Sequence, residues 1–176
     1  MPSTVEVYFH ECRGHRCGRW SKYPHHKEDQ KALEKSITED SIVHRHVRDE
    51  DNTWTTKSFT VHDSFMRAHL LSALEDYQDL DLELQKWMFK PPYEPLVHRW
   101  SSIVDIPESE EDPEKVKALS HLADFLRPIL ADPLEGASKT AETGMVTFDH
   151  IWHIFPPDEL VLTTFYGVET ACRITA

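Results

Sequence analysis

Four potential metal ligands lie close together near the start of the chain. Residues 10–17 have the sequence HECRGHRC, which contains His10, Cys12, His15 and Cys17. Imidazole nitrogens and thiolates are donors that Zn²⁺ prefers, and structural zinc sites hold the ion in a tetrahedron of four such groups. The spacing is unusual, because common zinc motifs take two pairs of ligands from segments about a dozen residues apart. The pattern therefore predicts either a zinc site or a polar arm that only resembles one.

Distant histidines offer further ligands for this cluster. His25 and His26 follow it closely, and His44 and His46 lie two residues apart in a later segment. A pair from either place would supply the second half of a conventional site. The choice between a zinc site and a polar arm stays open at this stage.

Other patterns associated with chemistry are incomplete. Residues 136–140, GASKT, resemble part of a phosphate-binding loop, but Ser138 and Pro133 stand where the motif requires glycine. His150 and His153 are three residues apart in a predicted helix and would face one side, yet the HExxH motif is absent. No GxSxG or CxxC motif marks a nucleophile. We therefore expect neither enzymatic activity nor a bound organic cofactor.

Charge and composition limit the class of protein. The chain has 176 residues, 39% of them hydrophobic, and a net charge of −12. Residues 63–176 carry all of this net negative charge, with 9 Lys/Arg against 21 Asp/Glu, while residues 1–62 are neutral. An acidic surface repels phosphate backbones, so nucleic acid is excluded as the expected partner.

The cysteines and the apolar segments indicate the compartment. Cys12, Cys17 and Cys172 form an odd set, which argues against a disulfide framework and for a reducing environment. No apolar run reaches the length of about 18 residues that a membrane span needs. The first residues lack the apolar stretch of a signal peptide. We expect an intracellular protein of the cytoplasm or nucleus.

Alternating apolar residues predict strands in the first half of the chain. Val5, Val7 and Phe9 alternate as in a short strand. Residues 42–48 and 54–61 predict a hairpin, because DEDN between them supplies turn residues. Residues 13–40 are polar and are expected to be loosely ordered, with a short helix around 27–36.

The next segments combine leucines and prolines. Leu80, Leu82 and Leu84 alternate with acidic residues, which fits a strand or a turn of helix, and the periodicity favours the strand. The prolines of KPPYEP, residues 90–95, predict an extended chain after it. Residues 96–106 are apolar and fit either a helix or a strand.

Two helices are predicted from caps and periodicity. Ser64 is expected to cap the first of them. Asp112-Pro113 combines a cap with the proline favoured in a first turn. The helix that follows has one apolar stripe: Val116, Leu119, Ala123, Leu126 and Leu130.

The end of the chain is predicted to contain a loop, a short helix and a hairpin. Residues 131–144 are expected to form the loop, and Thr147 to cap the helix that ends at Pro156-Pro157. Two β-branched runs around Gly167 predict the hairpin, with Cys172 as a small apolar side chain inside a strand.

Strands at both ends with helices between them predict the α+β class rather than a doubly wound α/β sheet. We expect a single domain with N- and C-terminal β-hairpins around a small set of amphipathic helices. Within the chain, residues 1–41 form a polar, His-rich and partly ordered segment. Residues 42–176 form the α+β domain.

Three stretches carry a family resemblance. The first is TVHDSFMRAHLLSAL, a strand that leads into a capped helix; the second is F-x-x-P-Y-x-P-L-x-H, from Phe89 to His98. The third is G-x-V-T-F-x-x-I-W-x-I-F-x-P, from Gly144 to Pro157. Over residues 42–175 the chain resembles the uncharacterised N-terminal domain that precedes the ATPase core in fungal AAA-family ATPases.

The resemblance implies a non-catalytic module that recognises another protein, which is either a client or an ATPase core. The chain contains no Walker A, Walker B or arginine-finger motif, so we expect no ATP hydrolysis of its own. In the third motif, Phe148, Trp152 and Phe155 are expected to anchor the short helix to the core. In the second, Tyr93 and Leu96 are expected to pin the proline-rich segment to the sheet.

Two other functions are kept as alternatives. One is a small zinc-binding protein that uses His10, Cys12, His15 and Cys17, with or without the histidines at 25 and 26. The other is an enzyme of unrecognised type built on His150 and His153. The sequence leaves the oligomeric state open.

Overall fold

One side of the molecule is built on a five-stranded mixed sheet. The computed structural model describes residues 1–11, 18–25, 30–78, 80–106 and 112–174. The strands lie in the order β2-β1-β3-β4-β5. Their bounds are β1 (Thr4–Glu11), β2 (Gly18–Ser21), β3 (Ile42–Arg48), β4 (Trp54–Val61) and β5 (Met88–Phe89). β1 runs parallel to β3, whereas the other neighbouring pairs are antiparallel.

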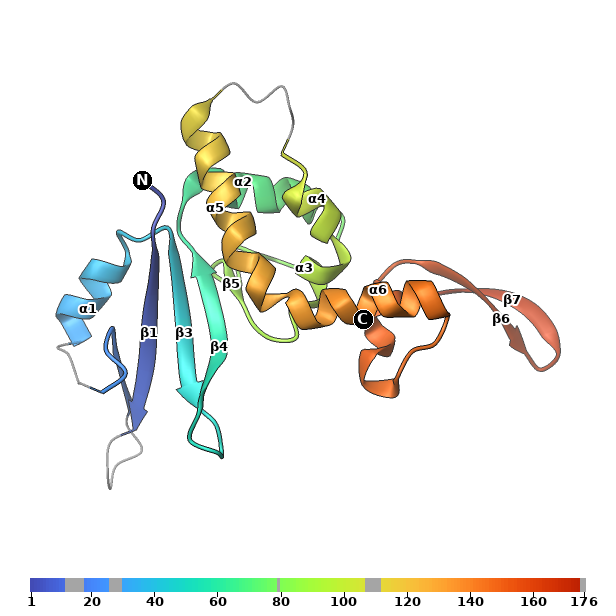
Figure 1. Cartoon of the computed structure of the whole chain (residues 1–176). Helices are drawn as coiled ribbons and strands as arrows, with labels where there is room; N and C mark the ends of the chain where they lie inside the picture. Colours follow the sequence, from blue (N-terminus) through green and yellow to red (C-terminus); the bar gives the residue numbers. More distant parts are fainter. Residues whose placement is uncertain (12–17, 26–29, 79, 107–111, 175–176) are drawn as a thin grey trace.

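Helices pack against this sheet on two sides (Figure 1). On one side Leu33 of α1 (Gln30–Ile37) packs with Val7 and Val43 in a small core. The other side carries the main core. Its helices are α2 (Ser64–Ala73), α3 (Glu94–His98), α4 (Trp100–Val104) and α5 (Pro113–Ile129).

The two cores follow from the alternation of side chains along a strand. Ile42, Phe59 and Val61 point to the main core, where Phe59 packs against Phe89 at 5.0 Å and Phe125 at 5.2 Å between ring centroids. Val43, next to Ile42, points to the small core. The sheet is thus buried on both faces where helices cover it.

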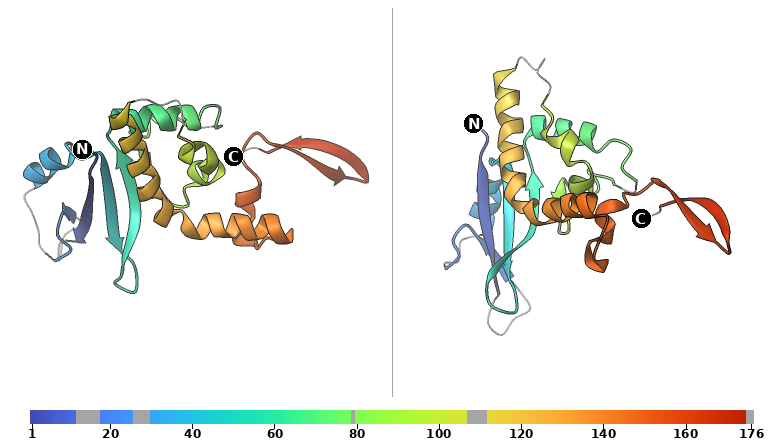
Figure 2. Two further views of the ribbon diagram at one scale, coloured as in Figure 1. Left: turned by 45° about the horizontal axis from the view of Figure 1, so that its top comes forward. Right: turned by 45° about the vertical axis from the view of Figure 1, so that its right-hand side comes forward.

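The C-terminal part extends away from the sheet (Figure 2). It consists of α6 (Ala131–Thr143), the 3₁₀ helix η1 (Phe148–Ile154) and a hairpin of β6 (Leu160–Phe165) and β7 (Val168–Arg173). Gly144, with φ +67°, ends α6 in the left-handed conformation that glycine adopts at little cost. Tyr166 and Gly167 both have positive φ, as a two-residue hairpin turn requires.

Several predictions are confirmed. The class is α+β, and the two hairpins occupy the predicted segments. Asp112 caps α5, since its side chain accepts hydrogen bonds from the backbone N–H groups of Glu114 and Lys115. Tyr93 and Leu96 are buried in the main core. Of the predicted apolar stripe, all residues except Val116 are buried.

The strand predicted over residues 80–84 is wrong. The chain forms turns over residues 82–87, and only Met88–Phe89 pairs with β4. Leu82 is buried but Leu84 is 82% exposed, so the three leucines do not share one buried face. The extended chain predicted for residues 90–95 is also interrupted, because α3 begins at Glu94 and holds Pro95 in its first turn, where no N–H is required.

Two further predictions need correction. Asp63, not Ser64, caps α2, because the Asp63 carboxylate accepts hydrogen bonds from the N–H groups of Phe65 and Met66. The predicted loop of residues 131–144 is instead helix α6 (Ala131–Thr143) with Gly144 as its C-cap, and GASKT lies inside the helix. Pro133 stands in the first turn of α6, where proline is tolerated. The short strand β2 lies in a segment for which only loose order and a helix were predicted.

Among the described residues, no helix combines the length and apolarity needed to cross a membrane.

Candidate functional site

The predicted His/Cys cluster is described only at His10. Its Nε2 donates a hydrogen bond of 3.0 Å to the backbone carbonyl of Tyr23, and its ring lies edge-on to Trp54 at 5.8 Å. Cys12, His15 and Cys17 lie outside the described residues. The zinc site at these four residues therefore stays a prediction. The side chains of the other pair, at positions 150 and 153, lie outside the described part as well.

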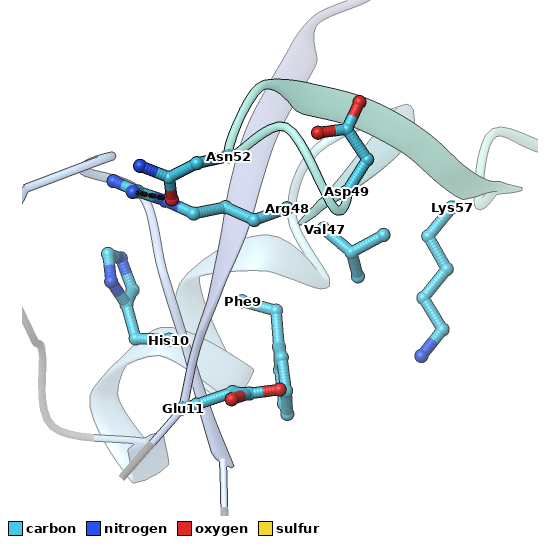
Figure 3. A pocket seen from close by; sticks show the side chains of 8 residues that line it. All are labelled: Phe9, His10, Glu11, Val47, Arg48, Asp49, Asn52 and Lys57. Carbon is cyan, nitrogen blue, oxygen red and sulfur yellow. Dashed lines mark hydrogen bonds between the residues drawn. The ribbon is translucent and has the colours of Figure 1, made fainter. Parts of the chain in front are cut away.

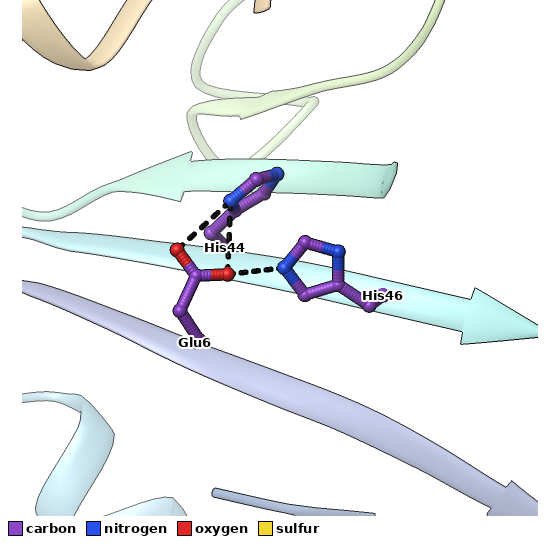
Figure 4. A group of neighbouring side chains, drawn as sticks. All are labelled: Glu6, His44 and His46. Atoms are coloured by element: carbon purple, nitrogen blue, oxygen red, sulfur yellow. Dashed lines mark hydrogen bonds and ion pairs between the residues drawn. The ribbon is translucent and has the colours of Figure 1, made fainter. Parts of the chain in front are cut away.

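A different group of metal-ligating side chains comes together on the sheet. Glu6 of β1 is paired with His44 of β3, and His46 lies two residues further along β3 on the same face. Both imidazoles turn toward the Glu6 carboxylate (Figure 4). His44 Nδ1 lies 3.2 Å from Glu6 Oε1 and 3.1 Å from Oε2, and His46 Nε2 contacts Oε2. One donor atom from each residue lies within 4.8 Å of the others.

Neighbouring side chains fix the orientation of both imidazoles. His44 is 8% exposed; its Nε2 lies 3.0 Å from Thr56 Oγ1 of β4, and its ring meets the edge of Phe125 of α5 at 5.2 Å. His46 stacks on Tyr8 of β1 at 5.1 Å. The cluster is thus held by three strands and a helix rather than by a loop.

The charge of Glu6 is set by its two partners. Partial burial raises the pKa of the Glu6 carboxyl, but the hydrogen bonds and charges of His44 and His46 outweigh it and lower the pKa to about 2. Glu6 is therefore ionised at neutral pH. An ionised carboxylate and two unprotonated imidazole nitrogens are donors that one metal ion can share.

Both histidines of β3 were named from the sequence as possible further ligands for residues 10–17. In the structure both imidazoles turn to the Glu6 carboxylate. The signal was the H-x-H spacing inside a predicted strand, which puts both rings on one face. The carboxylate was missed because the parallel pairing of β1 with β3 joins residues 38 positions apart.

An open pocket lies at the end of the sheet, where β1 ends and the turn between β3 and β4 begins (Figure 3). It has a volume of about 580 Å³ and is lined by both charged and aromatic residues. Arg48 lies over the Trp54 ring at 4.8 Å and hydrogen bonds to Asn52, while Lys57 lies 5.7 Å from the Phe9 ring. Both cations thus contact neighbours inside the protein, and the lining does not select one class of ligand.

The second unusual feature is the C-terminal unit, which we define as residues 147–174. Large apolar side chains are exposed along it: Tyr166 is 94% exposed, Phe148 88% and Leu162 84%. Leu160, Phe165 and Val168 are also more than half exposed. No buried core residue of the described chain comes from β6 or β7, and neither face of the hairpin lies under a helix or another sheet (Figures 1 and 2).

The base of this unit is attached to the body. His98 Nε2 donates a 2.7 Å hydrogen bond to the carbonyl of Trp152, and His98 Nδ1 lies 2.9 Å from the Tyr77 hydroxyl. The Trp152 side chain packs against the main core. At the start of the hairpin, Asp158 donates its N–H to the carbonyl of Ile174 at 2.9 Å. The hairpin is therefore fixed at its root and exposed beyond it.

These observations correct three expectations for the third motif and the hairpin. Phe148 and Phe155, which is 38% exposed, do not anchor η1 to the core as Trp152 does. Cys172 is exposed rather than packed, because no layer covers its strand in the described structure. Thr147 stands at the N-cap position of η1 with extended backbone, but its side chain makes no capping hydrogen bond to this helix.

Comparison with known proteins identifies one related segment. Residues 137–176 match the model of a family described as a domain of unknown function, DUF7025. No curated protein and no solved structure matches the chain. The match begins within α6 and takes in η1 and the hairpin, so this chain resembles that family in the segment that exposes its apolar side chains.

Proposed function

We propose that this chain is a non-catalytic interaction module that binds a protein partner through its C-terminal unit. The observation that carries the proposal is the exposure of Leu162, Phe165 and Tyr166 on a hairpin without a covering layer. Contiguous exposed apolar side chains on a soluble domain mark interaction surfaces. A two-stranded hairpin alone is also only marginally stable in water, so a partner would stabilise it.

The hairpin offers two means of recognition. Each strand has one edge that pairs with no other strand among the described residues, and an exposed edge accepts an added strand from a partner. Its apolar side chains lie on both faces, since Leu162 and Phe165 differ by an odd number of positions. This arrangement suits a partner that takes the hairpin into an apolar groove.

The charge of the chain narrows the class of partner. Glu159 and Glu169 are next in sequence to the exposed Leu160 and Val168, while Asp158 is ion-paired with Arg173. The whole chain carries −12. A partner with basic residues around an apolar groove would complement this surface, whereas nucleic acid would not. The resemblance to AAA-ATPase N-terminal domains suggests an ATPase core or one of its clients as that partner. A reducing intracellular compartment, cytoplasmic or nuclear, is part of this proposal.

Site-specific photocrosslinking in cells tests the proposal. A photoreactive amino acid is placed at Leu162 or Tyr166, and at Glu34 or Glu50 as exposed control positions on the sheet side. We expect the same protein adduct from both hairpin positions and none from the controls.

A double variant of the hairpin tests whether the crosslink depends on its exposed apolar side chains. The double substitution Leu162→Lys/Val168→Lys should abolish the adduct formed from position 166 while the circular dichroism spectrum of the protein is retained. Adducts at the control positions alone would contradict the assignment of the binding surface. An adduct between two copies of this chain would mean that the C-terminal unit binds a second copy of the chain and not a different protein.

A further inference from the structure

The donor atoms of the cluster on β1 and β3 cannot face one another without a proton or a metal ion between them. The carboxylate of Glu6 only accepts hydrogen bonds, and a neutral imidazole nitrogen presents either a proton or a lone pair. His44 Nδ1 lies within 3.2 Å of both carboxylate oxygens, and His46 Nε2 also contacts one of them. Lone pairs at such distances repel, so protons or a metal ion must occupy the space among the three groups.

We propose that Glu6, His44 and His46 bind one divalent transition-metal ion, with Zn²⁺ as the preferred ion. Two imidazoles and one carboxylate are a donor set that holds Zn²⁺ while water fills the fourth position. The set contains no soft thiolate, so it does not favour Cu⁺. This site is distinct from the His/Cys cluster of residues 10–17.

The surroundings prepare the imidazoles for this role. Thr56 Oγ1, 3.0 Å from His44 Nε2, can accept the ring proton and leave Nδ1 with its lone pair toward the ion. Such outer hydrogen bonds fix the tautomer of metal-binding histidines. The Tyr8 ring stacks on His46 and limits its rotation. Ligands on strands are also positioned more accurately than ligands on loops.

The cluster is accessible to an ion and lies between two strands. The side chain of Glu6 is 45% exposed and that of His46 14%, so solvent reaches one side of the site. Glu6 belongs to β1 and the histidines to β3, which pair in parallel and are joined by a long connection. A bound ion would therefore cross-link these strands and stabilise the folded chain.

Zinc titration of the full chain tests the proposal. Calorimetric titration of the metal-free protein with ZnCl₂ at neutral pH should give one ion per chain and a higher thermal midpoint. Glu6→Gln and His46→Gln should each weaken the affinity by at least tenfold. Thr56→Val, which leaves all three ligands in place, should weaken it by about 10- to 100-fold.

Control variants separate this site from the other candidates. His25→Gln, at an exposed histidine, and Cys12→Ser/Cys17→Ser should bind Zn²⁺ as the wild type does. Leu162→Lys/Val168→Lys should also leave binding unchanged, so failure of the proposed partner surface would not affect this result. Absence of stoichiometric binding, or loss of binding in the cysteine variant, would overturn the assignment.

An absorption spectrum of the wild-type protein tests the proposal even if Glu6→Gln or His46→Gln fails to fold. Co²⁺ in place of Zn²⁺ should give visible absorption bands of a four- or five-coordinate ion with nitrogen and oxygen ligands. A near-ultraviolet charge-transfer band from thiolate to Co²⁺ would show that cysteines bind the ion, and would overturn the proposal.

Discussion

Glu6 and His44, 38 residues apart in the chain, are paired in adjacent parallel strands, and both carboxylate oxygens lie within 3.2 Å of the imidazole Nδ1. The contact joins the N-terminal strand to the hairpin of β3 and β4. It therefore links the stability of the sheet to the ionisation of a single carboxyl group.

The first prediction concerns pH and uses metal-free protein in EDTA. The pKa of Glu6 is about 2 in the folded chain and 4.5 when unperturbed. A carboxyl with a lowered pKa stabilises the fold fully above its unfolded pKa, and this contribution is lost as the pH falls from 4.5 toward 2. Because the side chain is 45% exposed, solvent screening limits the effect to about 1 kcal/mol.

Urea denaturation of wild type and Glu6→Gln measures this contribution. The difference in unfolding free energy should be present at pH 7 and should disappear near pH 2. Glu34→Gln, on the exposed side of α1, should change stability by no more than about 0.5 kcal/mol at either pH. A difference for Glu6→Gln that does not vary with pH would rule out the ionised contact as its cause.

The second prediction distinguishes the two candidate caps of α2. The Asp63 carboxylate accepts hydrogen bonds from the N–H groups of Phe65 and Met66, at 2.9 and 3.1 Å. Asp63→Ala should therefore cost about 0.5–2 kcal/mol of stability. Ser64→Ala, one residue later on an exposed position, should change it by less than about 0.5 kcal/mol. Chemical denaturation that gives the larger loss for Ser64→Ala would favour the cap predicted from sequence.

Local patterns predicted most of the elements. The DEDN turn has the residues that a hairpin needs, and it lies between β3 and β4 as expected. Asp112-Pro113 marked the start of α5, because capping depends on neighbouring residues alone. Where the pattern was short it failed: three leucines in alternation over residues 80–84 fit a series of turns as well as a strand.

Two kinds of feature were not predicted from the sequence: a helix that contains poor helix formers, and strand pairings between residues far apart in the chain. α6 contains Pro133 and Gly136, both helix breakers by propensity, and the structure forms it because the proline stands in the first turn. The pairing of β1 with β3 depends on the whole sheet. For that reason the carboxylate of the cluster was missed although both of its histidines had been singled out.

The third prediction tests the main core. Leu122 of α5 is fully buried, whereas Leu84, which lies in a turn, is 82% exposed. Leu122→Ala should lower the free energy of unfolding by about 2–5 kcal/mol, because it leaves a cavity. Leu84→Ala removes the same atoms from a solvated position and should cost less than about 0.5 kcal/mol. Equal losses in thermal or urea unfolding would contradict the packing of α5 against the sheet.

The last prediction concerns the attachment of the C-terminal unit. His98 bridges the Tyr77 hydroxyl and the carbonyl of Trp152: the 2.7 Å bond joins α3 to η1, and the 2.9 Å bond joins α3 to the segment after α2. His98→Ala leaves both partly buried groups without this partner, which should cost about 1–3 kcal/mol. Since the lost bonds hold the root of the unit, its local opening should increase more than global unfolding does.

Limited proteolysis with mass spectrometry measures that opening. In His98→Ala, cleavage within residues 145–160 should become faster than in the wild type, while cleavage elsewhere changes little. His69→Ala is the matched control, because His69 Nε2 donates a similar 2.8 Å hydrogen bond to the carbonyl of Ile103 in α4. It should destabilise the helical layer without selective cleavage of the C-terminal unit. Equal cleavage of that unit in both variants would mean that His98 stabilises the fold as a whole and does not specifically hold the surface proposed for partner binding.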